Sequence, residues 1–375
     1  MFSIVVGARP NFMKIAPLVR AMRHAEVAWR IIHTGQHYDE RMSQTFFDEL
    51  HIPQPDVNLY VGSGTHVYQI SEVMRRLEVE FEQNRPEAVI VVGDVNSTLA
   101  AALCASKLSI PVAHVEAGLR SYDRSMPEET NRVVTDALAD WLFASEPAAV
   151  ENLRREGVAA ERIHLVGNVM IDTLLSHVDC ARALKCPEKL GLEPGRYTVL
   201  TLHRPSNVDD PHRLESILRA VRRIGADLPV VFPVHPRTEM RIREFGLEEL
   251  TAPPECLAIK PQGYLDMLGL VASARLVLTD SGGLQEETTA LKIPCLTLRE
   301  NTERPITVEL GSNRLVGWRT EDILAAARQI LDGPRHQGTV PPTWDGHASR
   351  RIVDVLLRGR GTAGQRENFA AATAR

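Results

Sequence analysis

The stretch that decides the fold is Leu278-Thr279-Asp280-Ser281-Gly282-Gly283-Leu284-Gln285-Glu286-Glu287. A short apolar strand, 276–278, runs into two adjacent glycines, and a helix-like segment follows. Glycines let the backbone come close to a ligand, and the first N–H groups of a helix are open to an anion. A carboxylate one turn into that helix, at Glu286 or Glu287, suits a sugar hydroxyl better than a phosphate. The pattern is typical of a nucleotide diphosphate site with a hydroxyl clamp, although an ordinary strand–turn–helix corner with a capping serine has the same pattern.

Short apolar runs of this kind recur along the chain and alternate with longer amphipathic segments such as Asn96–Lys107 and Thr320–Leu331. The predicted strands are Ile4–Val6, Arg30–His33, Ala88–Val92, Val112–Val115, Trp141–Ala144 and Ile163–Val166, followed by Tyr197–Leu202, Val230–Val234, Leu257–Ile259, Leu276–Leu278, Pro294–Leu298 and Arg314–Val316. Strands rich in Val, Ile and Leu between helices predict parallel sheets covered on both faces. Because the two series are similar in size, we expect an α/β protein with two doubly wound, Rossmann-like parallel-sheet domains facing a central cleft.

The boundary between these domains is expected between Gly167 and Gly195, where a polar helix leads to turn-forming residues. We place the first domain at 1–167 and the second at 168–346. The residues 359–375 are small, polar and aperiodic, so we expect a disordered tail.

Composition excludes several classes of function. The chain has 375 residues, 44% hydrophobic content and a net charge of −5, so two domains are expected and a nucleic-acid partner is not. The five cysteines have no Cys-x-x-Cys spacing, which favours a reducing compartment and offers no zinc site. No apolar run approaches the ~20 residues that span a bilayer, and no signal peptide is visible, so we expect a cytoplasmic protein without a membrane partner.

Polar residues follow many of the predicted strands. In an open parallel sheet, ligands bind outside the carboxyl ends of the strands. In the first half these residues are Arg9, Asp94 and Glu116, and in the second half they are His203, Arg204, His235, Asp280 and Ser281. Each of them singly has an ordinary structural reading, such as a helix cap or a structural histidine. Together, carboxylates on one rim (with Glu128 and Glu129) predict acid–base chemistry, and histidines and arginines on the other predict diphosphate binding.

Several motifs are missing from the sequence. No Gly-x-Gly-x-x-Gly follows a strand, no Walker loop occurs, and no metal-ligand spacing is present. We therefore expect no nicotinamide or other cofactor and no metal, and chemistry that runs on side chains and the substrate itself.

At these residues the chain resembles the non-hydrolysing UDP-N-acetylglucosamine 2-epimerases, enzymes of the GT-B fold, over roughly 4–357. The motifs that carry the resemblance are Gly7-Ala8-Arg9-Pro10 with Lys14, Gly93-Asp94, His114-Val115-Glu116-Ala117-Gly118-Leu119-Arg120, Pro127-Glu128-Glu129 with Asn131-Arg132, His203-Arg204, Pro233-Val234-His235, Asp280-Ser281-Gly282-Gly283, Thr302-Glu303-Arg304-Pro305 and Arg314-Leu315-Val316-Gly317. The resemblance implies inversion of C2 in UDP-GlcNAc to give UDP-ManNAc, through anti elimination of UDP to a 2-acetamidoglucal and re-addition of UDP. It also implies a homodimer, a use in cell-envelope or capsule precursors, and a C-terminal helix near 347–358 that returns to the first domain.

The resemblance assigns roles to individual residues. The acid–base carboxylates would be Asp94, Glu116 and Glu128, and His203 would stabilise the leaving diphosphate. Substrate-binding residues would be Arg9, Lys14, Arg204, His235, Gln262, Ser281, Gly282, Gly283, Glu287 and Arg314. Among these, a solvated first-turn Lys14 and a His235 that only shapes the cleft are open alternatives. Glu303 and Arg304 are expected to pair with each other rather than to contact ligand.

The sequence also departs from the family pattern. Asn11 stands where many members have Glu, Pro205-Ser206 replaces Arg-Glu, and Tyr38-Asp39-Glu40 interrupts the usual glutamine spacing after His37. The departures at these last two segments put activation by substrate at a second site in question. The variant at Asn11 also occurs in relatives that epimerise UDP-2,3-diacetamido-2,3-dideoxyglucuronic acid, which is therefore an alternative substrate.

Three other functions fit parts of the pattern. A GT-B glycosyltransferase shares the expected fold, a nucleotide-sugar sensor would keep only the Ser281–Gly283 side, and a hydrolysing epimerase would release free ManNAc. The joint presence of Asp94, Glu116 and Glu128 favours the epimerase over the first two.

Overall fold

The computed structural model describes residues 1–36, 47–333 and 338–359, without the side chain of Arg9. The segment Tyr38–Glu40 and, beyond Gly359, the predicted tail lie outside the described residues. Two compact units divide the chain: Met1–Thr173 together with the chain from Thr343, and Leu174–Pro342. The limits predicted from the sequence, 167/168 and 346/347, fall near these divisions and stay a prediction.

In the described residues, the first unit contains a parallel sheet of seven strands in the order β3-β2-β1-β4-β5-β6-β7. The strands are β1 (Phe2–Val6), β2 (Trp29–His33), β3 (Val57–Asn58), β4 (Ala88–Val92), β5 (Val112–Ala117), β6 (Trp141–Ala144) and β7 (Ile163–Leu165). The order reverses between β1 and β4, and this switch point is where a doubly wound sheet binds ligands. The loops that carry Arg9 and Asp94 leave the sheet there.

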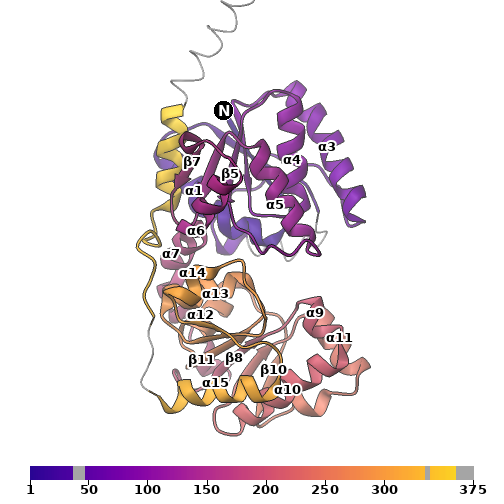
Figure 1. Cartoon of the computed structure of the whole chain (residues 1–375), viewed down its shortest axis with the longest axis vertical. Helices are drawn as coiled ribbons and strands as arrows, with labels where there is room; N and C mark the ends of the chain where they lie inside the picture. Colours follow the sequence, from indigo (N-terminus) through magenta and orange to yellow (C-terminus); the bar gives the residue numbers. More distant parts are fainter. Residues whose placement is uncertain (37–46, 334–337, 360–375) are drawn as a thin grey trace, which may run out of the picture. The chain divides into compact units, whose positions relative to one another are not determined.

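The helices of the first unit cover the two faces of this sheet. They are α1 (Arg9–His24), α3 (His66–Gln83), α4 (Asn96–Lys107), α5 (Pro127–Leu138), α6 (Pro147–Arg155) and the start of α7 (Val169–Ala183). Val89 and Val91 of β4 pack with Leu77 and Phe81 of α3 in one buried cluster. Figure 1 shows α3, α4 and α5 side by side. Strands buried on both faces explain the near-continuous apolar runs in the sequence.

The described part of the second unit repeats this plan with six parallel strands in the order β10-β9-β8-β11-β12-β13. They are β8 (Thr198–Thr201), β9 (Val230–Pro233), β10 (Cys256–Ile259), β11 (Leu276–Thr279), β12 (Cys295–Thr297) and β13 (Asn313–Leu315). Alternate residues of β11 serve opposite faces, because Leu276 and Leu278 pack in one cluster and Val277 packs in another. Here the switch point lies between β8 and β11, at the ends of which stand His203 and Asp280.

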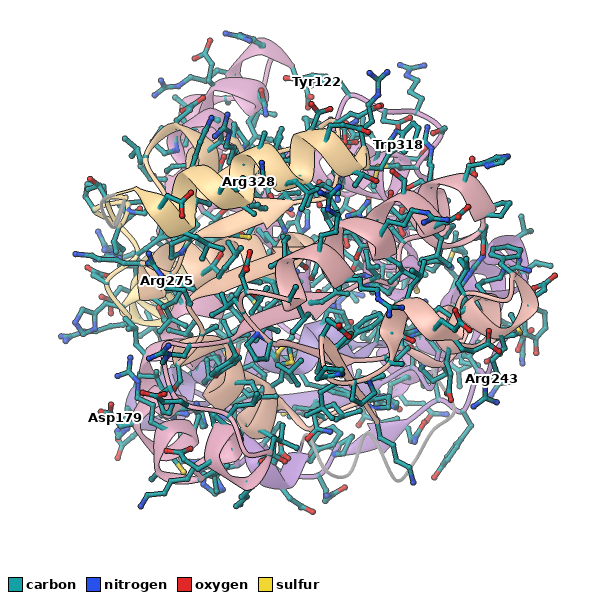
Figure 2. The ribbon with its side chains drawn as sticks, turned by 90° about the horizontal axis from the view of Figure 1, so that it is seen from below. Tyr122, Asp179, Arg243, Arg275, Trp318 and Arg328 are labelled. Atoms are coloured by element: carbon teal, nitrogen blue, oxygen red, sulfur yellow. The ribbon has the colours of Figure 1, made fainter. Side chains whose placement is uncertain are left out.

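Helices also cover both faces of the second sheet. They are α8 (Cys186–Lys189), α9 (Pro205–Val208), α10 (Pro211–Gly225), α11 (Pro236–Glu244), α12 (Tyr264–Ala272), α13 (Gly282–Leu291), α14 (Pro305–Glu309) and α15 (Thr320–Asp332). Figure 1 shows α10 and α15 side by side. The guanidinium of Arg213 on α10 lies 5.1 Å from the ring centroid of Trp318, just before α15 begins. Near the end of α15, the carbonyl of Ile330 accepts from Arg275 at 3.1 Å. Figure 2 labels Trp318 and Arg275. The prediction of two doubly wound parallel α/β sheets is confirmed.

The C-terminal part of the chain is tied to the first unit. Trp344 Nε1 donates to the carbonyl of Ser145 at 3.2 Å. The carboxylate of Asp172 on α7 accepts from the N–H groups of Ala348 (3.1 Å) and Ser349 (2.7 Å) and from the hydroxyl of Ser349 (2.6 Å), where the helix at 348–359 begins. Burial raises the pKa of Asp172, against the hydrogen bonds of Ser349. No described helix is both long enough and apolar enough to cross a membrane.

Replacing Asp172 with Ala should destabilise the protein by about 1–3 kcal/mol, because three donors at the start of the C-terminal helix lose their buried acceptor. Urea unfolding measures the loss, and hydrogen exchange of the amides in 348–359 should become faster. The matched control is Asp345→Ala, which removes an exposed carboxylate paired with Arg351 and should change stability by less than about 1 kcal/mol. Unchanged amide protection in the Asp172 variant would show that this carboxylate does not hold the helix.

Candidate functional site

In the first unit, Asp94 follows β4 through a left-handed turn at Gly93, whose φ is +67°. Its carboxylate lies 2.5 Å from Nη2 of Arg132, and the side chain is 22% exposed. Asn131 donates to the backbone carbonyl of Asp94 at 2.8 Å. Asn131 and Arg132, two neighbouring residues of α5, therefore hold the backbone carbonyl and the carboxylate of Asp94, and the side chain remains accessible.

Glu116 stands inside β5 in an unusual backbone conformation. Its φ is +73°, and the pairing of β5 with β6 shifts register between Val115 and Ala117. A bulge of this kind redirects a side chain, and a positive φ at a non-glycine residue costs on the order of 1–3 kcal/mol. The buried Glu116 carboxylate lies 2.5 Å from Nζ of Lys14 on α1, which is also buried. Lys14 is therefore not a solvated first-turn lysine.

Gly93 has to be a glycine for a second reason. A Cβ added there would lie 2.6 Å from Lys14 Nζ. The ammonium group thus packs against the turn that precedes Asp94 while it binds Glu116. One cation on α1 thus contacts both the turn after β4 and the carboxylate at the bulge of β5, so the two carboxylates are held at the same edge of the sheet.

The first turn of α5 supplies two further carboxylates with different surroundings. Glu129 accepts from the N–H groups of Ser121 and Tyr122, both at 2.9 Å, and from Arg132 at 2.8 Å. Burial acts to raise the pKa of Glu129, but these hydrogen bonds outweigh it and hold that pKa below its ordinary value. Glu128 is half-buried and makes no side-chain hydrogen bond or ion pair in the described residues. Glu129 therefore has a structural role, whereas Glu128 is the more available acid.

A fully buried network lies beneath these carboxylates. His114 Nδ1 is 2.6 Å from Asp136, and His114 Nε2 is 2.9 Å from the carbonyl of Gly93. Asp136 also binds Arg120 Nη2 at 2.7 Å and accepts from the N–H of Gly118 at 3.0 Å. Burial acts to raise the pKa of Asp136, but His114 and Arg120 outweigh it and lower that pKa. The network joins the turn before Asp94 to both sides of the bulge at Glu116.

Asn11 explains one departure of the sequence. Its amide oxygen accepts from the N–H groups of Gly7 (3.0 Å) and Ala8 (3.1 Å), and its amide nitrogen donates to the carbonyl of Val92 at 3.0 Å. A carboxylate could make the first two bonds but has no proton for the third. Asn11 thus ties the end of β1 to the end of β4, next to Gly93.

The predicted contact of Arg9 stays a prediction, because the structure does not describe the side chain of Arg9.

In the second unit, the turn between β11 and α13 is open at the helix N-terminus. Ser281 is the N-cap residue of α13, but its side chain makes no capping hydrogen bond. Gly282 and Gly283 follow, and all three residues are half-buried. The serine therefore does not serve as an ordinary cap, and the first N–H groups of α13 remain suitable for an anion.

Asp280 joins this turn to the loop after β8. Its fully buried carboxylate accepts from the N–H groups of His203 (3.1 Å) and Arg204 (2.9 Å), and Nδ1 of His203 lies 3.0 Å away. Arg204 Nε donates to the Asp280 carbonyl at 3.0 Å. Asn207 on α9 also donates to this carboxylate at 3.3 Å and to the carbonyl of Leu298 at 2.9 Å. The structure thus brings His203, Arg204 and Ser281 together around one buried anion.

Glu303 lies beside the same helix N-terminus. It is buried and accepts from Arg204 Nη2 at 3.3 Å and from Arg299 Nη2 at 2.8 Å. Burial acts to raise the pKa of Glu303, but Arg304, Arg299 and Arg204 outweigh it and hold that pKa far below its ordinary value. Gly282 lies close to Glu303, since a Cβ built at Gly282 would come within 2.8 Å of Glu303 Oε1.

The carboxyl group expected to bind sugar hydroxyls is Glu287. Burial, with the neighbouring Glu286 charge, raises the pKa of Glu287 to about 8. Glu286 itself lies 2.6 Å from Arg304 Nε, and burial together with Glu287 raises the pKa of the buried Tyr264 phenol. A Glu287 that holds its proton at neutral pH can both donate to and accept from a hydroxyl group.

Three other predicted residues have local partners. His235 is exposed, its Nδ1 accepts from the N–H of Arg237 at 3.3 Å, and its ring centroid lies 6.2 Å from that of His203. Gln262 donates to the carbonyl of Lys260, two residues away, at 2.6 Å. Arg314 is exposed on β13 and donates to Gln329 of α15, and no hydrogen bond or ion pair links it to Ser281 in the described residues.

Several residues that organise the site were not among the predicted site residues. Asp280 was noted only as a strand-end residue, and Asn207, Arg299 and the His114–Asp136 pair were not assigned roles. Their signal in the sequence is weak, because a buried polar side chain is informative only once its burial is known. A histidine follows β8, and an aspartate follows the adjacent strand β11. This pattern could have revealed that Asp280 binds His203.

Comparisons with known proteins agree on one group of relatives. A family model described as UDP-N-acetylglucosamine 2-epimerase matches residues 20–357. The UDP-N-acetylglucosamine 2-epimerase of Methanocaldococcus jannaschii is 44% identical over 364 residues, covering 96% of this chain and 99% of the relative. The UDP-2,3-diacetamido-2,3-dideoxy-D-glucuronate 2-epimerase of Pseudomonas aeruginosa is 41% identical, covering 94% and 98%. The crystal structure of the M. jannaschii enzyme in complex with UDP-GlcNAc and UDP superimposes with a TM-score of 0.87 at 43% identity, covering 95% of this chain and 99% of that one.

The buried Glu287 predicts a pH dependence of stability. Because its pKa is raised from 4.5 to about 8 in the folded protein, its contribution is complete below about pH 4.5 and is lost as pH rises towards 8. Between these values the free energy of unfolding should fall by up to about 1.4 kcal/mol per pH unit from this group. Glu287→Gln removes the titration, so the stability of this variant relative to the wild type should increase with pH.

Urea unfolding of the ligand-free protein at several values from pH 5 to pH 8 measures this difference. The control is Glu321→Gln, an exposed carboxylate in the first turn of α15, which should run parallel to the wild type. A Glu287→Gln curve that is also parallel would mean that Glu287 is ionised in the folded protein.

Proposed function

The chain belongs to the UDP-N-acetylglucosamine 2-epimerase family, and we propose that it is an isomerase that interconverts UDP-GlcNAc and UDP-ManNAc. The observation that carries the proposal is the pair Asp94 and Glu116, held at one sheet edge by separate cations, Arg132 and Lys14. Glu116 keeps a strained backbone there, which is common at sites of chemistry. The turn from Ser281 to Gly283 in the second unit supports a nucleotide diphosphate as the carrier of the sugar.

The chemistry follows from the weak acidity of the C2 proton. Loosening the bond between C1 and the diphosphate oxygen makes that proton removable. A carboxylate then takes the proton, the C2–H electron pair becomes the C1=C2 double bond, and the C1–O electron pair leaves with UDP. The intermediate is a 2-acetamidoglucal. Re-addition of UDP at C1, with protonation of C2 from the opposite face, gives the epimer and leaves the enzyme unchanged.

Acid–base work falls to residues of the first unit. Asp94, Glu116 and Glu128 are the proposed acid–base carboxylates. Lys14 lies 2.5 Å from the Glu116 carboxylate, and Arg132 lies 2.5 Å from the Asp94 carboxylate. One carboxylate that has lost its proton and another that keeps it can serve the two faces of the sugar.

Diphosphate and nucleoside binding fall to residues of the second unit. The N–H groups of Gly282 and Gly283 at the start of α13 and the Ser281 hydroxyl suit phosphate oxygens, whereas the Ser281 N–H already donates to Thr279 Oγ1 at 2.9 Å. Arg204 adds a positive charge beside them. His203 is placed to stabilise charge on the leaving diphosphate. Glu287 is the proposed partner of the ribose hydroxyls. Arg9, His235, Gln262 and Arg314 stay predicted ligand contacts, and Arg314 is the weakest of them because it binds Gln329.

A second substrate is supported by one observation. The P. aeruginosa relative, 41% identical over nearly its whole length, acts by its name on a UDP-diacetamido-glucuronate. An acidic sugar would require an extra cation in the sugar pocket.

We also infer a cytoplasmic homodimer from the family resemblance. Light scattering that gives twice the chain mass of 41.7 kDa would support the dimer.

Proton NMR of the purified protein with UDP-GlcNAc in heavy water tests the function. We expect UDP-ManNAc signals to grow with deuterium at C2 of both sugars, because each elimination exchanges that proton. Asp94→Asn should lower the exchange rate by about 100-fold or more, as expected for loss of an acid–base group. Its affinity for UDP should change little, since the proposed diphosphate contacts lie in the second unit.

The matched control is Glu151→Gln, which changes an exposed carboxylate paired with Arg155 and should keep full activity. Release of free ManNAc would move the protein to a hydrolysing reaction. No exchange with UDP-GlcNAc, in a folded protein that binds UDP, would overturn the proposed substrate. Exchange with the diacetamido-glucuronate instead would identify the second candidate.

A further inference from the structure

The imidazole of His203 is held from one side. Its Nδ1 lies 3.0 Å from Oδ1 of Asp280, and the ring is 44% exposed while the carboxylate is fully buried. No described residue forms a hydrogen bond with Nε2, and the nearest aromatic neighbour is the ring of His235 at 6.2 Å between centroids. Because Asp280 has only acceptors to offer when it is ionised, Nδ1 must carry the proton in this contact. Nε2 is then the ring atom that remains for a ligand.

The surroundings of Asp280 favour its ionised form. Four donors converge on the carboxylate: the N–H groups of His203 and Arg204, the side chain of His203 and the amide of Asn207. Burial acts to raise the pKa of Asp280, but these hydrogen bonds and the His203 charge outweigh it and lower that pKa. An imidazole that carries a proton on both nitrogens can bind a carboxylate through Nδ1 and donate from Nε2 to an anion.

The backbone contacts place that donor next to the open helix N-terminus. Asp280 is the residue immediately before Ser281, and it binds the N–H of His203 as well as its ring. The ring is therefore restrained at two points relative to the turn that is proposed to hold the diphosphate. A carboxylate that orients a histidine in this way sets both the tautomer and the direction of the other nitrogen.

We propose that Asp280 is a positioning residue for the epimerisation: it binds the Nδ1 proton of His203, so that Nε2 donates a hydrogen bond to the diphosphate as the C1–O bond breaks. The inference rests on the proposed function. Asp280 touches neither the sugar nor the diphosphate and acts through His203. The competing hypothesis is that Asp280 only ties two loops together. Its hydrogen bonds to the backbone N–H groups of His203 and Arg204 would suffice for that role.

A double-mutant cycle separates these readings. Asp280→Asn should lower kcat by about 10- to 100-fold, the usual cost of losing a residue that orients a functional histidine, while KM and the Kd for UDP change less than about threefold. In a His203→Gln background, the same substitution should lower kcat by less than about threefold, because there is no imidazole left to position. Equal losses in both backgrounds, or a parallel loss of UDP affinity, would show that Asp280 is only a loop tie.

The control for this cycle is Thr201→Val. It removes the hydroxyl that lies 2.6 Å from Thr279 Oγ1 across β8 and β11, near the same turn, without touching His203 or Asp280. We expect kcat within about threefold of the wild type, as for a near-isosteric change away from reacting groups. A loss as large as that of Asp280→Asn would mean that any disturbance of this turn impairs the reaction, and the inference would fail.

A second measurement holds even where Asp280→Asn does not fold. In wild-type protein labelled with ¹⁵N-histidine, NMR should show His203 with a proton on Nδ1 and a far-downfield shift typical of a bond to a carboxylate. The signal is assigned by its loss in His203→Gln. A His203 protonated only on Nε2 would overturn the inference. Deuterium exchange at C2 in the wild type decides the proposed function separately, so the two failures are distinguishable.

Discussion

A buried carboxylate has to be surrounded by hydrogen-bond donors, and at Asp280 this requirement organises the second unit around the proposed diphosphate site. The donors come from the loop after β8, because β8 and β11 are adjacent strands at the point where the order of the sheet reverses. The hydrogen bonds that these donors make to the Asp280 carboxylate therefore fix the backbone of His203 and Arg204 and the direction of the His203 ring. The following residue, Ser281, needs no capping role, so the N-terminus of α13 stays open to an anion.

In the first unit, cationic side chains bind the carboxylates of the site. Lys14 holds the Glu116 carboxylate, and Arg132 holds that of Asp94. Replacing a charge partner in such a pair leaves an uncompensated buried charge, which is far more costly than the pair itself is stabilising. The ion pairs thus fix the positions of these two carboxylates at the carboxyl ends of β4 and β5.

Backbone strain is stored at this edge of the sheet and is offset by the network below it. The left-handed conformation of Glu116 is held on one side by the Lys14 ion pair and on the other by His114, Asp136 and Gly118. Gly93 allows Lys14 to approach the turn, and Asn11 ties the ends of β1 and β4 next to it. Four chain segments thus depend on a few polar residues that would have little value in isolation.

The sequence by itself determined the α/β class, the parallel strands and most of the residues at their carboxyl ends, since these follow from local periodicity and from what comes directly after each strand. Even at the strand ends whose residues the sequence identified, however, the sequence could not determine which side chains pair with one another. Arg314, whose predicted phosphate contact stays a prediction, binds Gln329 on α15, whereas its neighbour Asn313 turns inward to Gln285 and Thr307. Glu303 was expected to pair with the adjacent Arg304, and the Arg304 charge does lower the pKa of Glu303, but the Glu303 carboxylate also binds Arg204 and Arg299. Lys14 is buried against Glu116. Only the tertiary structure decided these pairings, because a charged side chain takes the partner that burial and strand register bring within reach, and residues some 100 positions apart in sequence become neighbours only when the sheet has formed.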